Sequence, residues 1–179
     1  MADVPAPLAL VESFLNSVDV ETGLDDLRDV ATFRHWLADH DRPAEADEHD
    51  LDLARRLRTE LRAEAATHHQ QPDQAEPRDR GALDALAVRI PLAVRFAPDG
   101  AAVPGPTGTG VTGVLGEVLA AVALAAHDGS WRRVKICPAD DCRWVYYDAS
   151  RNSSRRWCSM QVCGNRNKTR SYRQRTAPA

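Results

Sequence analysis

Lysine is nearly absent from this chain, which has two lysines against 21 arginines and none before Lys135. The glycine-rich segment VPGPTGTGVTG (103–113) therefore lacks the Gly-Lys-Ser/Thr ending of a phosphate-binding loop, and we interpret it as a connector. No stretch approaches about eighteen consecutive apolar residues, which argues against a membrane-spanning helix. The N-terminus carries acidic residues early and has no basic region, unlike a signal peptide. We therefore expect a cytoplasmic protein with no membrane partner.

The N-terminal part of the chain is predicted to be one mainly helical domain, residues 1–130. Hydrophobic residues make up 43% of the 179 residues, enough for a packed core. Apolar side chains at helical spacing predict helices near residues 8–18, 27–37, 45–69, 80–90 and 111–126. Within this domain LAVRF (92–96) alternates like a strand and meets the tight-turn signal Pro98-Asp99-Gly100, which predicts a short β-hairpin.

The C-terminal part, residues 131–179, is predicted to be a small β-hairpin-plus-helix module. β-Branched and aromatic residues in WRRVKICPADDCRWVYY (131–147) predict two short β segments. A helix is expected over about 154–175, with Ser153 or Ser154 as its N-cap. The predicted fold class is therefore α+β, mainly α: a helical N-terminal domain with a short β-hairpin, followed by this small module, which is expected to hold zinc.

The net charge of −3 conceals a strong asymmetry. Residues 1–130 hold 11 basic against 23 acidic residues, a balance of −12. Residues 131–179 hold 12 basic against three acidic residues, a balance of +9, which four thiolates and one zinc(II) would lower to +7. An acidic body with a basic end is expected where that end meets a polyanion.

The chain has only four cysteines, all in its last quarter: Cys137, Cys142, Cys158 and Cys163. They form two Cys-x4-Cys pairs with fifteen residues between the pairs. Four thiolates satisfy the tetrahedral geometry of structural zinc. Because the sequence shows no export signal, we expect a reducing compartment, in which disulfides are rare. We therefore expect all four cysteines to ligate one Zn²⁺. Disulfides and an iron–sulfur cluster remain the alternatives. A catalytic zinc is disfavoured because four cysteines close the coordination shell, and the redox motif Cys-x-x-Cys is absent.

Basic and amide side chains gather around and after the second cysteine pair, and no acidic residue follows Asp148. Arginine suits bidentate contact with phosphate or guanine, and amides can read base edges. A solvated surface helix is the alternative, although such a helix normally mixes charges of both signs. The predicted nucleic-acid contacts are Arg151, Arg155, Arg156, Asn165, Arg166, Lys168, Arg170, Arg173 and Arg175.

The segment CPADDCRWVYYDASRNSSRRWCSMQVCGNRNKTRSYRQR (137–175) closely resembles the CGNR zinc finger, named for the motif present here as Cys163-Gly164-Asn165-Arg166. Upstream, LVESFLNSVD (10–19) and DVATFRHWLADH (29–40) resemble the ABATE domain that usually precedes this finger. The resemblance implies a stress-induced bacterial transcription regulator. Asn16 belongs to the ABATE pattern, and we expect it to line a small-molecule pocket or to tie a buried backbone.

The sequence thus predicts a DNA-binding transcription regulator whose N-terminal domain binds a small-molecule effector, mediates homo-oligomerisation, or does both. An RNA-binding protein is one alternative, because a basic zinc module does not choose DNA on charge alone. A protein–protein adaptor is another, in which the basic helix docks on an acidic partner or on this chain's own acidic domain. No nucleophile–base pair, open metal site or phosphate loop supports an enzyme. His68 and His69 are expected to be solvated.

Overall fold

The computed structural model describes residues 4–69 and 79–176, with the backbone alone for 171–176. The predicted mainly helical α+β fold is confirmed. The elements in chain order are α1 (Ala6–Leu15), β1 (Val18–Asp19), β2 (Leu24–Asp25), α2 (Val30–Asp39), α3 (Glu48–Ala66), η1 (Thr67–His69), α4 (Gly81–Arg89), β3 (Leu92–Phe96), β4 (Ala102–Pro106), α5 (Gly110–His127), η2 (Ser130–Arg133), β5 (Val134–Ile136), β6 (Val145–Tyr147), η3 (Met160–Gly164) and α6 (Asn165–Thr176).

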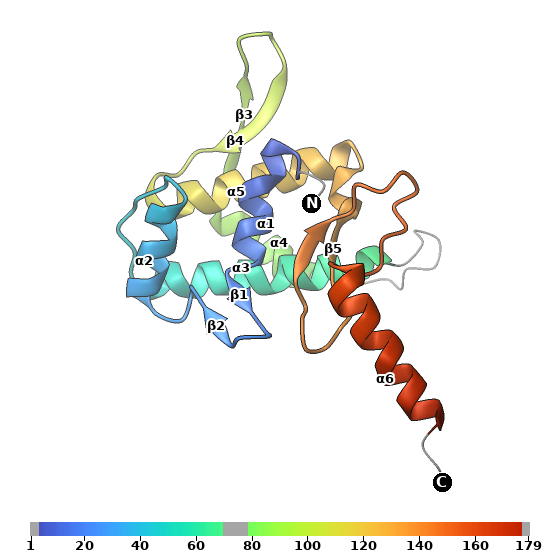
Figure 1. The fold of residues 1–179 in the computed structure, drawn as a ribbon. Helices are drawn as coiled ribbons and strands as arrows, with labels where there is room; N and C mark the ends of the chain where they lie inside the picture. The colour runs from blue at the N-terminus through green and yellow to red at the C-terminus, as the bar shows by residue number, and fades with distance from the viewer. Residues whose placement is uncertain (1–3, 70–78, 177–179) are drawn as a thin grey trace.

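Helix α1 lies between α3 and α5 at the centre of the molecule (Figure 1). Its apolar residues recur at helical spacing, and Val11, Phe14 and Leu15 are completely buried. The long helix α3 starts at the N-cap Asp47, whose carboxylate accepts hydrogen bonds from two backbone N–H groups of the first turn. Leu57 and Leu61, four residues apart on α3, are also fully buried, so one face of α3 closes the core against α1.

The β5–β6 hairpin packs against the same core, although it lies beyond residue 130 in the sequence (Figure 1). Its residues Val134, Ile136 and Val145 belong to the main apolar cluster, and Trp131 just before it is buried there too. Contacts of β5 with α3 and of β6 with α1 join the hairpin to the helical body. The division of the chain near residue 130 stays a prediction, because the packing continues across it.

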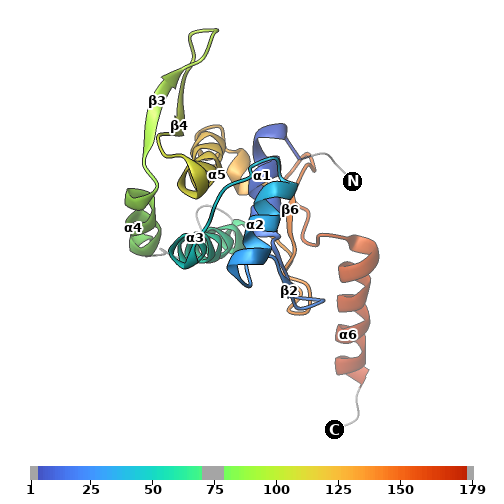
Figure 2. The same ribbon diagram turned by 90° about the vertical axis from the view of Figure 1, so that its left-hand side faces the viewer.

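Two elements project from opposite sides of the body: the β3–β4 hairpin and helix α6 (Figures 1 and 2). β3 and β4 pair antiparallel, with Leu92 opposite Pro106 and Phe96 opposite Ala102. Helix α6 extends beyond the packed core, and among its residues 165–170 all but Asn167 are exposed.

Helix α5 is long and apolar enough to cross a membrane by length and composition alone, with a mean hydropathy of 1.6 over 18 residues. The core helix of a soluble protein meets the same criterion. Here Leu115 and Val118 are buried against the core, and Glu117 pairs with Arg42 at 2.8 Å. Glu117 interrupts the apolar residues of α5, and the helix packs against the core. Both observations agree with a core position for α5.

The helix expected over about 154–175 begins at Met160, with the π-helical turn η3 that continues into α6, so its start was predicted wrongly. Before it, Ser153 has a positive φ of 48°. The Arg155 N–H donates to the Asp148 carboxylate, and the Arg155 carbonyl accepts from the Tyr146 hydroxyl. Because side chains of the hairpin and its following loop take the backbone groups of this segment, those groups are not free for a helical ladder.

Candidate metal centre and basic helix

The first cysteine pair lies on the turn that connects β5 to β6. The Cys137 N–H donates to the Trp144 carbonyl at 2.8 Å, which continues the hairpin ladder past β5. The N–H groups of Cys142 and Arg143 both donate to the Ala139 carbonyl, at 3.0 and 3.1 Å. Arg143 has a φ of 53°, which sharpens the return of the chain. This closed turn holds Cys137 and Cys142 buried at one end of the hairpin.

The second pair lies at the start of the C-terminal helical segment. Cys158 precedes the π-helical turn η3, and Cys163 lies within it. The Gly164 N–H donates to the Ser159 carbonyl at 3.1 Å, a wide turn that differs from α-helical spacing. A Cβ at Gly164 would collide with the Met160 sulfur, so the glycine of the CGNR motif permits this close packing.

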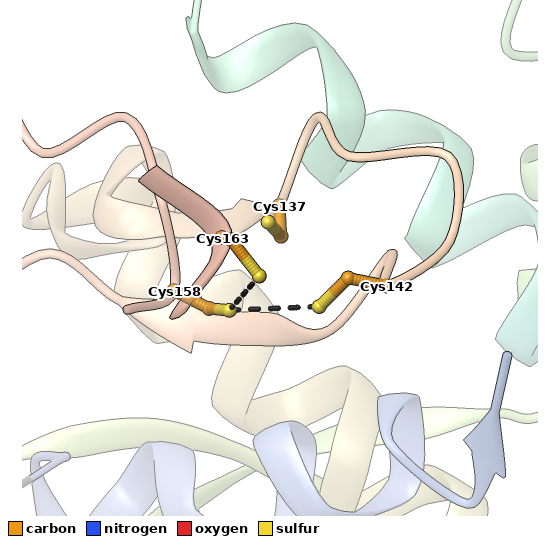
Figure 3. Close-up of side chains that lie close together, drawn as sticks. All are labelled: Cys137, Cys142, Cys158 and Cys163. Atoms are coloured by element: carbon orange, nitrogen blue, oxygen red, sulfur yellow. Dashed lines mark hydrogen bonds between the residues drawn. The ribbon is translucent and has the colours of Figure 1, made fainter. Parts of the chain in front are cut away.

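The four sulfur atoms converge and lie within 4.8 Å of one another (Figure 3). Cys158 Sγ is 3.5 Å from both Cys142 Sγ and Cys163 Sγ. Four sulfurs about 2.3 Å from one tetrahedral zinc would lie about 3.8 Å apart, so the cluster has the dimensions of a single-ion site. A disulfide requires about 2.05 Å between sulfurs, and all four cysteines are free.

The pKa values of the thiols reflect their crowding. Burial raises the pKa of Cys158 far above its ordinary value and raises that of Cys163 to about 11. Burial acts the same way on Cys137, but the backbone N–H groups of Cys158 and Ala139 donate to its sulfur and lower its pKa. Thiols packed together oppose one another's ionisation, whereas a bound cation would favour the thiolates. The donor set therefore fits a divalent ion.

Apolar side chains surround the cluster on its inner side. Tyr146 is buried against the cysteines, and Trp157 packs beside them, in a small apolar group separate from the main core. On the outer side a hollow of about 210 Å³, lined by Cys142, Cys158 and Cys163 together with Trp144 and others, leads to the sulfurs. The site is thus enclosed by the protein on one side and reachable by an ion from the other.

A buried ion pair fixes the loop between β6 and the second cysteine pair. Lys135 Nζ lies 2.7 Å from the Asp148 carboxylate, and the two side chains are 4% and 0% exposed. The same ammonium donates to the Ser153 carbonyl, while Asp148 also accepts from the backbone N–H groups of Ser150 and Arg155. This network connects β5 to the loop of residues 148–157, here called the basic loop because it carries Arg151, Arg155 and Arg156.

The Arg155 side chain bonds to the backbone next to the second cysteine pair. Its guanidinium donates to the Trp157 carbonyl at 2.9 Å and to the Cys158 carbonyl, and it lies 4.8 Å from the centre of the Tyr146 ring. These contacts brace the backbone that carries Cys158. That Arg155 also contacts nucleic acid stays a prediction.

Arg166 and Arg170 on α6 face acidic side chains of the same chain. Arg166 donates to Glu21, in the β1–β2 turn, at 2.9 Å and to Asp141, in the first cysteine turn, at 3.5 Å. Arg170 donates to Asp141 at 3.1 Å. The CGNR arginine therefore connects α6 to the N-terminal part and to the first cysteine pair.

Three other predicted contacts are exposed and have no ion-pair partner in the part of the chain that the structure describes: Arg151, Arg156 and Lys168. The guanidinium of Arg156 lies over the Trp157 ring at 5.4 Å, and Asn165, also exposed, donates to the Gln161 carbonyl. The side chains of Arg173 and Arg175 lie outside the described residues.

A polar hollow of about 520 Å³ adjoins this basic loop. It lies between the end of the α3–η1 segment, which supplies His69, and the loop that supplies Asn152, Ser154 and Arg156. The hollow therefore continues the exposed basic surface toward the helical body.

Polar residues of the N-terminal part hold the module in place, and sequence reasoning had singled out only Asn16 among them. The Asn16 amide donates to the Val145 carbonyl at 2.9 Å and accepts from its N–H at 2.8 Å, so it ties a buried backbone. His68 was expected in solvent but is buried, and its ring bonds to the Val134 carbonyl at 2.7 Å. His69 is exposed as expected, although its ring also bonds to the Ile136 carbonyl at 2.6 Å. Asn16 was visible only through its place in the ABATE pattern, and neither histidine gave any signal.

The comparisons with known families agree with this geometry. Residues 133–176 match the model of the CGNR zinc finger, and residues 8–129 match the model named ABATE, described as "Putative stress-induced transcription regulator". The second match covers more than half of the chain. The chain belongs to the ABATE family. Comparison with curated proteins gives no match.

The order of the two matches, ABATE followed by CGNR finger, is the one that the sequence predicted. Both families are of regulatory or zinc-finger type rather than enzymatic. The cysteine cluster is accordingly a candidate metal centre in a protein of a transcription-regulator family.

Proposed function

We propose that this protein is a DNA-binding transcription regulator of the cytoplasm, whose CGNR module is held in shape by one zinc ion. The observation that carries the proposal is the convergence of Cys137, Cys142, Cys158 and Cys163 within 4.8 Å. Bound zinc would supply a cross-link between the β5–β6 turn and the start of α6. Sulfurs 3.5 Å apart suit one shared ion better than an iron–sulfur cluster, which must place several irons and sulfides between its thiolates.

The nucleic-acid surface is proposed on charge and exposure. Arg151, Arg156 and Lys168 are exposed beside the metal centre, and no acidic residue occurs after Asp148. Phosphate contacts supply much of the affinity of such surfaces, and they need cations that are not neutralised within the protein. The proposed contact surface is therefore the part of the module that bears Arg151, Arg156 and Lys168.

The ABATE domain would act on this module through direct packing. Asn16, the C-cap of α1, holds the backbone of β6, and His68 and His69 in η1 hold β5. A change in the helical body, whether on binding an effector or on association, would therefore move the hairpin that carries the first cysteine pair. This coupling supports a sensory or assembly role for residues 1–130.

The test combines metal analysis with DNA titration. Purified protein should contain one zinc per chain, and its affinity for duplex DNA should fall with salt, by about 0.9 in logarithmic slope for each phosphate contacted. Chelation under reducing conditions should abolish the binding. Zinc-loaded protein that binds no duplex at low salt, or binds it without salt dependence, would disprove the proposal.

Matched variants separate contact residues from structural ones. Arg156→Gln and Lys168→Gln should weaken DNA binding and reduce the salt slope by about one each, because each removes a phosphate contact. Arg56→Gln, an exposed arginine on α3, removes the same charge elsewhere and should leave the affinity unchanged. Competition with structured RNA distinguishes the RNA-binding alternative: preference for RNA would replace DNA as the partner.

A further inference from the structure

The β3–β4 hairpin stands apart from the body, opposite α6 (Figures 1 and 2). Within residues 4–69 and 79–176 the sheet consists of these two strands, and neither outer edge is paired. Isolated two-stranded hairpins are marginally stable in water, and an exposed edge is a template for another strand. The hairpin is therefore a candidate for strand addition.

The pairing register shows which backbone groups face outward. Ala97 N–H donates to the Ala101 carbonyl at 2.9 Å and Thr107 N–H donates to the Pro91 carbonyl at 3.2 Å, so both of these pairs are hydrogen-bonded. Hydrogen-bonded and non-hydrogen-bonded pairs alternate along an antiparallel ladder. Every second residue of β3 therefore directs its N–H and C=O away from β4. These residues are Leu92, Val94 and Phe96.

The outer edge of β4 cannot accept a strand in the same way. Its outward positions lie opposite those of β3 and are occupied by Ala102, Pro104 and Pro106. Proline has no N–H, so two of these three positions lack a donor. Strand addition is thus restricted to the edge of β3.

The exposed edge also carries an apolar face that lacks a cover. Val94 is 68% exposed and Phe96 is 78% exposed, on the side of the sheet that also bears Leu92. At the base of the hairpin this face lies on α5, where a Cβ at Gly116 would come within 2.7 Å of the Pro106 Cβ. The face is therefore packed at its base and bare toward its tip.

We propose that β3 pairs with β3 of a second copy of this chain, antiparallel and about a two-fold axis at Val94. The outward groups of the two strands then match: Val94 faces the partner's Val94, and Leu92 faces the partner's Phe96. The result is a four-stranded sheet with about six new main-chain hydrogen bonds. Phe96 of each copy then lies beside Leu92 at the base of the other copy's hairpin, and this contact covers the exposed ring of Phe96.

The strand suits a second copy because its sequence is compatible with itself. β3 has no acidic residue, and its one charged side chain, Arg95, faces Ala93 of the partner across the axis. Arg95 also donates to the Pro106 carbonyl of its own hairpin, on the side away from the apolar face. The two Arg95 side chains are diagonal neighbours rather than directly opposite, and each bonds to its own hairpin at the Pro106 carbonyl, away from the axis. An isologous contact of this kind closes at a dimer.

Sedimentation of the full-length, zinc-loaded protein over a range of concentrations tests the proposal. We expect a monomer–dimer equilibrium for the unaltered chain. Val94→Lys places two ammonium groups opposite each other on the axis and should weaken the dimer roughly tenfold or more. Ala102→Lys puts the same charge on the same face one strand further from the axis, and it should dimerise like the unaltered chain.

A second variant separates edge pairing from face-to-face stacking. Val94→Pro removes an outward N–H without touching the ladder to β4, so it should weaken the dimer while the hairpin and the zinc content stay intact. An unaltered chain that is monomeric at every concentration would overturn the proposal. So would a Val94→Pro dimer of full strength, or an Ala102→Lys dimer as weak as Val94→Lys. These outcomes leave the proposed function untouched, because the four cysteines lie elsewhere.

Discussion

Replacing Lys135 by methionine tests the network that joins β5 to the basic loop. Methionine keeps an unbranched apolar stem but removes the cation 2.7 Å from Asp148, whose side chain is 0% exposed. It also leaves the Ser153 carbonyl without its donor. Removing one partner of a buried ion pair typically costs about 3–5 kcal/mol, because the remaining charge is desolvated and unpaired. For a chain of this size that corresponds to a fall in Tm of roughly 6–20 °C.

The measurement is urea unfolding of zinc-loaded protein followed by tryptophan fluorescence. The pH dependence adds a specific signature. Burial opposes ionisation of Asp148, but hydrogen bonds from Lys135 and Ser150 outweigh it and lower its pKa. Its contribution is therefore present above the unfolded pKa and is lost as pH falls through the lower folded value. In Lys135→Met the carboxyl should protonate at higher pH, so the stability gap should be widest near neutrality and narrow in acid.

The control is Arg56→Met, which breaks an exposed pair with Asp52 and should leave stability unchanged within error. Adding Asp148→Asn to Lys135→Met should recover part of the loss, because the unpaired charge is gone. A loss below about 1 kcal/mol for Lys135→Met, or a double variant less stable than the single one, would refute the reasoning.

Three further predictions follow from contacts between the ABATE domain and the module. Asn16→Ala leaves the N–H and C=O of Val145 without partners and should lower the free energy of unfolding by about 2–3 kcal/mol in urea titrations. Glu21→Gln removes one of the two carboxylates on Arg166 and should raise the affinity for duplex DNA roughly two- to fivefold at low salt, and less at high salt. Burial lowers the pKa of His68 and outweighs its hydrogen bond to Val134, which acts in the opposite direction. The free energy of unfolding should therefore be greatest above the pKa of His68 in the unfolded chain, about 6.5, and should decline as pH falls toward the lower pKa in the folded chain.

Each of these has a discriminating control. Asn16→Asp keeps the acceptor for the Val145 N–H but sets a carboxylate oxygen against the Val145 carbonyl, so it should be no more stable than Asn16→Ala. An Asn16→Asp chain as stable as the unaltered one would show that the paired bonds are not the cause. Glu45→Gln removes an exposed acid that pairs with Arg34 of α2 instead of with α6, and an equal gain in DNA affinity would attribute the effect to net charge alone. His68→Gln should flatten the stability profile just below about pH 6.5, and an unchanged profile would assign that slope to other groups.

The four cysteines and the glycine of the CGNR motif were identifiable from the sequence, because metal ligation and a crowded turn depend on residue type and local spacing. The helices of the N-terminal region were identifiable for a similar reason, since apolar periodicity of about 3.6 is a local property. The predicted start of the last helix was wrong over 154–159, where the N–H and C=O of Arg155 bond to the Asp148 and Tyr146 side chains instead of to a helical ladder.

What only the tertiary structure decided is where charged and polar side chains find partners. Lys135 was counted among the cations of a basic module, yet it is buried on Asp148, and Arg166 is paired with Glu21 from the opposite end of the chain. His68, taken for a solvated residue, is enclosed against β5. Desolvation and ion pairing depend on groups that are distant in sequence and are brought together only by packing, so no local pattern encodes them.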